Sequence, residues 1–204
     1  MIFDRLFNFW TPKRKGDWII TYSGEHFWPI DARPEEVHVV DIAHSLSNQC
    51  RYAGHCRIHY PIAVHTLLGL RLLKGYNNFI KFIWLNHDDT EAYVLDLPSP
   101  LKKYTNWGRM YSKNEHKLMK VIGKRFDIPH DFPQVVKDVD LAMLALEGRL
   151  LMKGDWYIKY QPYLDKFKES GFTKMTDADI LSPVEAEKQW IEAFYSLSHN
   201  KNIV

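Results

Sequence analysis

Two histidines and two aspartates stand among apolar residues, where an imidazole or carboxylate is costly to bury unless it is paired or bound to a metal ion. They are His65, His87, Asp88 and Asp140. Each alone fits a hydrogen-bonded structural group, but together they form a nitrogen and oxygen set without cysteine. Such a set suits Mn²⁺, Fe²⁺, Co²⁺, Zn²⁺ or Mg²⁺ and leaves coordination positions open for water and a further ligand. We therefore expect one divalent ion per chain.

Helical spacing brings these groups to buried faces. The segment 77–95 is apolar nearly all round between Phe79 and Leu85, which is typical of a central buried helix. At 100° per residue, Glu91 lies only about 40° from His87 on that helix. The expected helix 61–74 aligns His65 with leucines, and the expected helix 133–152 places Asp140 and Glu147 in an apolar stripe.

Composition indicates one globular domain. The 204 residues are 46% hydrophobic and 25% charged, and the net charge of +2 is too balanced for a protein whose main partner is nucleic acid. No apolar stretch reaches the length of a membrane span, and Asp4 and Arg5 interrupt the N-terminal apolar run, which argues against a signal peptide. Cys50 and Cys56 fit neither a disulfide framework nor a zinc clip, so we expect free thiols and a cytoplasmic protein.

The pattern of elements predicts an all-α fold with a short N-terminal β-hairpin. Residues 18–30 carry aromatic and β-branched residues on both sides of Ser23-Gly24, which is typical of a hairpin. Helical spacing follows, interrupted by glycines and prolines. The expected helices span about 41–49, 61–74, 77–95, 106–126, 133–152 and 183–198, in a single domain 1–204 whose metal-site helices lie within 61–152.

Three segments resemble the HD-domain metal phosphohydrolases. The run Leu85 to Lys102 (LNHDDTEAYVLDLPSPLK) resembles the His-Asp-x-x-Glu and Asp-Leu-Pro-x-Pro-x-Lys segment of bacterial 5′-deoxynucleotidases of the YfbR type and of phage dATP triphosphohydrolases of the DatZ type. Val136 to Asp140 resembles their Val-Lys-x-x-Asp, and Ala63 to His65 their Ala-x-His. The resemblance covers about residues 20–150 and implies an HD-domain helical bundle.

The resemblance also implies roles for individual residues. His65, His87, Asp88 and Asp140 would be the metal ligands, and Glu91 would be the general acid/base beside the catalytic Asp88. The substrate-binding residues would be Arg51 and Lys102 at phosphate, Tyr52 at the nucleoside, Asp96 at the sugar 3′ edge and Pro100 in the turn beside it. Tyr52 stands where the family has tryptophan, so base preference does not carry over.

The activity implied is hydrolysis of the 5′-phosphoester of a deoxynucleotide. A monophosphate would release phosphate and a triphosphate would release triphosphate, with deoxyadenosine nucleotides the best single expectation. Related enzymes are homo-oligomers, so the resemblance implies a homo-oligomer for this chain. We expect a small-molecule deoxynucleotide as partner, and neither a membrane nor a stable nucleic-acid complex. The alternatives are a cyclic- or signalling-nucleotide hydrolase on the same metal site, and a non-catalytic protein that binds nucleotides or nucleic acid.

Other polar groups have simpler interpretations. Residues 102–125 hold eight basic side chains and one acid, Glu115, which we expect to form a solvated face that also steers anions. Glu115 falls on the apolar side of its helix and is expected to pair with a base such as Lys137. We expect His44, His55 and His59 to cap helices or hydrogen-bond in the core rather than bind a second metal ion.

Overall fold

The computed structural model describes residues 13–198 and has the all-α architecture with an N-terminal hairpin that the sequence predicts. The N-terminal run that argues against a signal peptide lies outside these residues. The helices are α1 (Val39–Asn48), α2 (Ile62–Leu72), α3 (Asn78–Leu85), α4 (Glu91–Val94), α5 (Ser99–Tyr104), α6 (Asn106–Phe126), α7 (Gln134–Leu151), α8 (Gln161–Asp165) and α9 (Pro183–Leu197). Within the described part of the chain, no helix is both long and apolar enough to cross a membrane.

The hairpin pairs β1 (Ile19–Ile20) with β2 (His26–Phe27) in antiparallel register, with Ile19 opposite Phe27. Gly24 adopts a φ of +89° in the connecting turn, a conformation that favours glycine. Phe27 is fully buried and stacks on Tyr93 of α4 with ring centroids 3.9 Å apart. The hairpin is thereby fixed to the helical body, although each strand has only two residues.

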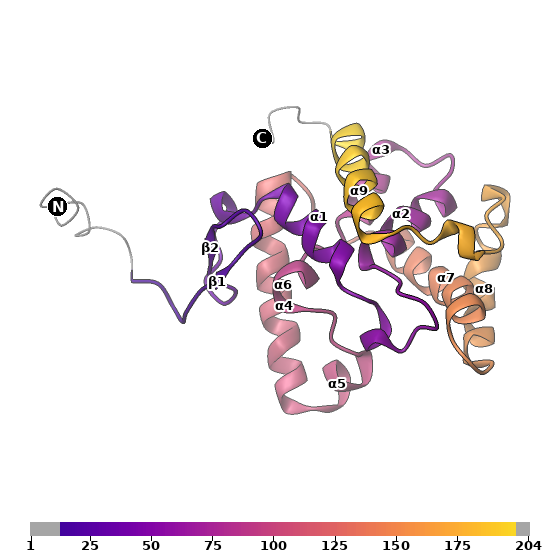
Figure 1. The fold of residues 1–204 in the computed structure, drawn as a ribbon, viewed down its shortest axis with the longest axis horizontal. Coiled ribbons are helices and arrows are strands. Elements are labelled where there is room, and N and C mark those ends of the chain that lie inside the picture. The colour runs from indigo at the N-terminus through magenta and orange to yellow at the C-terminus, as the bar shows by residue number, and fades with distance from the viewer. Residues whose placement is uncertain (1–12, 199–204) are drawn as a thin grey trace, which may run out of the picture.

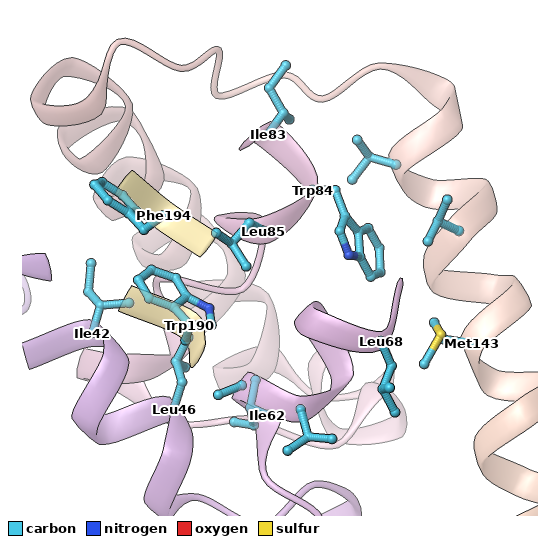
Figure 2. Packing of buried hydrophobic residues seen from close by; sticks show 14 of the residues in the cluster. Ile42, Leu46, Ile62, Leu68, Ile83, Trp84, Leu85, Met143, Trp190 and Phe194 are labelled. Atoms are coloured by element: carbon cyan, nitrogen blue, oxygen red, sulfur yellow. The ribbon is translucent and has the colours of Figure 1, made fainter. Parts of the chain in front are cut away.

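The helices pack around one hydrophobic core. In Figure 1, α6 runs along one side of the molecule and α7 with α8 along the other, with α1, α2, α3 and α9 between them. α9 packs on α1, α2 and α3, and Figure 2 shows its Trp190 beside Ile42 and Leu46 of α1. The indole N–H groups of Trp190 and Trp84 both donate to Thr66, to its hydroxyl and its carbonyl respectively.

The expected continuous helix 77–95 is wrong. α3 ends at Leu85, residues 86–90 form turns, and α4 starts at Glu91. The Asn86 side chain donates to the carbonyl of Phe82 (2.7 Å), and the turn then proceeds through bonds between residues three apart, such as Glu91 N–H to Asp88 O (2.9 Å). Asn and Asp compete in this way with helical backbone bonding. The helical-wheel relation between His87 and Glu91 therefore does not hold.

Candidate metal centre

Three of the four expected ligands converge. His65 lies on α2, and His87 and Asp88 lie in the turn after α3, with one donor atom of each within 4.8 Å of the other two. His65 Nε2 is 3.7 Å from Asp88 Oδ2, and His87 Nε2 is 3.2 Å from Asp88 Oδ1. His65 Nε2 and Asp88 Oδ2 are buried and have no hydrogen-bond partner among the described residues. These two atoms can each give a lone pair to a metal ion, and their position close to each other fits a bound divalent ion.

The fourth expected ligand, Asp140 of α7, lies at the edge of this group. Its Oδ1 is 3.6 Å from His65 Nε2, but it is not within the tight set formed by the other three residues. The Asp140 side chain is 41% exposed, so the expectation that it is buried in an apolar stripe is wrong. The α7 side of the centre is therefore partly exposed to solvent.

Glu147 of α7 orients His65. Its fully buried carboxylate accepts hydrogen bonds from His65 Nδ1 (2.5 Å), the Tyr60 hydroxyl (2.9 Å) and the Tyr52 hydroxyl (2.5 Å). Burial by itself would raise the pKa of Glu147, but Arg51 and His65 lower it to about 2. An ionised carboxylate requires His65 Nδ1 to donate, which leaves the Nε2 lone pair for a metal ion.

His87 is oriented by the backbone. Its Nδ1 lies 2.6 Å from the carbonyl of Trp84, which can only accept, so Nδ1 donates and Nε2 faces Asp88. The ring stacks on Trp84 with centroids 4.2 Å apart. Burial lowers the pKa of His87 and so favours the neutral imidazole, the form that binds metal ions.

Arg51 and Tyr52 occupy the loop after α1. The buried Arg51 guanidinium lies 3.5 Å from both Asp88 and Glu147. Burial would lower the pKa of Arg51, but these carboxylates raise it overall, so the group stays charged. Tyr52 and Ala53 have φ values of +56° and +51°, a left-handed conformation that costs free energy and must be compensated by surrounding contacts. The Tyr52 hydroxyl points inward to Glu147, so Tyr52 helps to hold the centre together.

His87 and Asp88 open into a cavity of about 270 Å³, which Glu91 and Lys102 also line. Glu91 is buried, and burial together with Asp88 and Asp96 raises its pKa well above the usual range. Its Oε1 lies 3.8 Å from Lys102 Nζ, and Oε2 has no hydrogen-bond partner in the described structure. The raised pKa favours the protonated form of the Glu91 carboxyl group, which lines the cavity beside the candidate ligands.

Glu115 of α6 pairs with Lys102 of α5 (2.8 Å), so the expected pairing with Lys137 is wrong. The extra helix α5, which the sequence did not predict among its prolines, carries Lys102 to this place. Asp96 lies half-buried between α4 and α5 and raises the pKa values of both Glu91 and Lys102. Pro100 is exposed in the first turn of α5 and is not a lining residue of the described cavity.

Two features were missed by sequence reasoning. Glu147 was recognised as a buried carboxylate, but its partners at positions 52, 60 and 65 carry no sequence signal. His116 and His130 line the same cavity as His87 and form, with Asp131, a second group of potential ligands. In the sequence, Pro129 and Pro133 flank His130 and Asp131, and these prolines are the signal that could have indicated a rigid loop there. His44, which the sequence predicts to form a hydrogen bond rather than to bind a second metal ion, lies 2.9 Å from a carboxylate oxygen of Glu187.

Fold and site together define an α-helical protein with a partly buried His/Asp cluster compatible with a metal ion. No family model matches the chain. It is 36% identical over 180 residues to the uncharacterized protein YfdR of Escherichia coli, covering 88% of this chain and 95% of that protein, and it belongs to the YfdR family. It is also 28% identical over 142 residues to the uncharacterized protein RCAP_rcc00048 of Rhodobacter capsulatus, covering 67% of this chain and 71% of that one.

Proposed function

We propose that the protein is an HD-domain metal-dependent phosphohydrolase that cleaves the 5′-phosphoester bond of deoxynucleotides. The observation that carries the proposal is the convergence of His65, His87 and Asp88 beside a cavity lined by a buried acid and a lysine. Two buried ligand atoms of this group, His65 Nε2 and Asp88 Oδ2, have no hydrogen-bond partner among the described residues. A purely structural cluster has no use for unpaired ligand atoms next to solvent-accessible space. The Leu85 to Lys102 resemblance supplies the substrate class.

Each residue around the cavity has its own role in the proposed hydrolysis. When bound, a divalent ion supplies the Lewis acidity that activates water and polarises a phosphoester. The raised pKa of Glu91 favours its protonated form, which gives its proton to the leaving 5′-oxygen as the phosphorus–oxygen bond breaks. The attacking water forms the new phosphorus–oxygen bond, and its proton restores the Glu91 carboxyl group. Lys102 provides positive charge for the phosphate and is held in place by Glu115. Arg51 adds positive charge beside Asp88.

Deoxyribose selectivity is assigned to Asp96, as the resemblance implies. The side chain lies at the end of α4, close enough to Glu91 and Lys102 to raise their pKa values. When this carboxylate accepts from the sugar 3′-hydroxyl, a 2′-hydroxyl should clash with it or be badly paired. ATP should therefore be a poorer substrate than dATP.

The direct test incubates protein loaded with Co²⁺ or Mn²⁺ with each deoxynucleoside mono- and triphosphate, and separately with cyclic nucleotides, and identifies the product. Release of phosphate or of triphosphate supports the proposal and decides which substrate is used. His87→Ala and Asp140→Ala should lose both activity and the ion of this centre. Asp138→Ala is the matched control, because Asp138 lies on α7 near Asp140 but bonds Lys166 at the surface. Hydrolysis of cyclic nucleotides alone, or no hydrolysis by metal-loaded protein, would overturn the proposal.

A further inference from the structure

A second group of ligand-type side chains stands in the wall of the same cavity. His116 lies on α6, and His130 and Asp131 lie in the loop before α7, with one donor atom of each within 4.8 Å of the other two. His130 Nε2 is 3.3 Å from Asp131 Oδ2, and the His116 and His130 rings lie edge to face with centroids 5.5 Å apart. Donor atoms bound to one ion must lie within a few ångströms of each other, and this group meets that condition.

The fold holds the loop against α6. Asp127 ends the helix in the left-handed conformation (φ +57°), and the chain turns back so that Ile128 N–H donates to the Gly123 carbonyl (3.0 Å). Gly123 permits this approach, because a β-carbon there would lie 2.5 Å from the Ile128 carbonyl oxygen. Pro129 and Pro133 restrict the backbone on both sides of His130 and Asp131. Because the backbone of this loop is already held in place, less backbone entropy is lost when an ion binds.

The residue types select the kind of ion. Two imidazoles and one carboxylate suit Zn²⁺, Co²⁺, Ni²⁺, Mn²⁺ or Fe²⁺, whereas Mg²⁺ and Ca²⁺ prefer sites made of oxygen. The three side chains are exposed, so an ion can enter and water can fill the remaining positions. Glu115, the neighbouring acid on α6, is occupied by Lys102 and does not belong to the group.

We propose that His116, His130 and Asp131 bind a second divalent transition-metal ion, so that each chain holds two ions rather than the one that the sequence predicts. His116 and His130 line the cavity into which His87 and Asp88 open, and the two groups share no residue. The remaining coordination positions of the second ion are therefore available to an anionic ligand in that cavity. The proposal does not depend on hydrolase activity, because ion binding is measured without nucleotide.

The experiment measures bound metal in protein without a histidine tag. Apoprotein is dialysed against buffered Zn²⁺ or Co²⁺, and the ions per chain are determined by elemental analysis, with affinities from calorimetry. Wild type should bind two ions, and His116→Ala and His130→Ala should each keep only the ion of the His87 centre. His87→Ala should keep only the other ion. In His116→Ala and His130→Ala, the affinity of the second site for the ion should fall by at least about 10–100-fold, which is the loss caused by removing a residue that only hydrogen-bonds to a metal ligand.

His59→Ala is the matched control, since His59 is an exposed histidine outside both groups. It should retain two ions. The variants at His59, His116 and His130 change exposed residues, and circular dichroism verifies that these variants and His87→Ala fold. One ion per wild-type chain, or two ions in both His116→Ala and His130→Ala, would overturn the proposal. Two ions without any nucleotide hydrolysis would leave this site standing and remove only the proposed activity.

Discussion

Gly69 in α2 links the packing of the core to the candidate metal centre. A methyl group at this position would overlap the Trp84 indole, with Nε1 only 2.6 Å from the added carbon. Trp84 donates through Nε1 to the Thr66 carbonyl (2.7 Å) and stacks on His87. Gly69→Ala must therefore displace the ring that supports a metal ligand.

Helix propensity and core packing predict opposite signs for the change in stability caused by Gly69→Ala. Helix propensity alone predicts that Gly69→Ala stabilises the protein by about 1 kcal/mol. Overpacking of a core costs about 1–3 kcal/mol, and an unsatisfied buried hydrogen-bonding group costs about as much again. We expect a net loss of about 3 kcal/mol, which lowers the Tm of a chain of this size by about 6–12 °C.

Thermal unfolding of metal-free protein measures this loss, and a Co²⁺ titration should show weaker binding at the His87 centre. Trp84→Phe supplies the control, because a smaller ring leaves room for the methyl group. In the Trp84→Phe background, Gly69→Ala should cost less, with a coupling free energy of about 0.5–3 kcal/mol. A Gly69→Ala protein as stable as wild type, or more stable, would refute the argument.

Three further predictions concern the carboxylates of the site. In metal-free protein, Glu147→Gln should lose about 3–5 kcal/mol at pH 7, because the buried Arg51 loses the fully buried one of its two carboxylate partners. Since folding lowers the Glu147 pKa from 4.5 to about 2, wild type loses stability as the pH falls between these values, and urea unfolding should show a weaker acid dependence in the variant. Glu91→Gln should keep metal and lower kcat by about 10²–10⁴-fold, and normal turnover with a lowered Tm would make Glu91 structural. Asp96→Ala should bring the kcat/KM values for dATP and ATP closer together, and equal values in wild type would contradict the assigned selectivity.

The positions of most helices follow from local sequence, because apolar periodicity and proline punctuation act within a few residues. α6, α7 and α9 begin and end close to their expected limits. The break after Leu85 is different. On a helical wheel, residues 86–91 continue the apolar face of the preceding residues, which predicts one long helix. Their Asn and Asp side chains, in buried surroundings, favour turns instead.

Ligand types, too, are visible in the sequence, since a histidine or carboxylate in an apolar stripe is conspicuous wherever it occurs. Which of them meet is decided only by tertiary structure. Glu147 accepts hydrogen bonds from residues up to 95 positions away in the chain, and Glu115 pairs with Lys102 rather than with the expected Lys137. His116 and His130 meet because Gly123 allows the chain to fold back on α6. Sequence determines chemistry residue by residue, whereas the distances that turn these residues into a site arise from packing between segments remote in the chain.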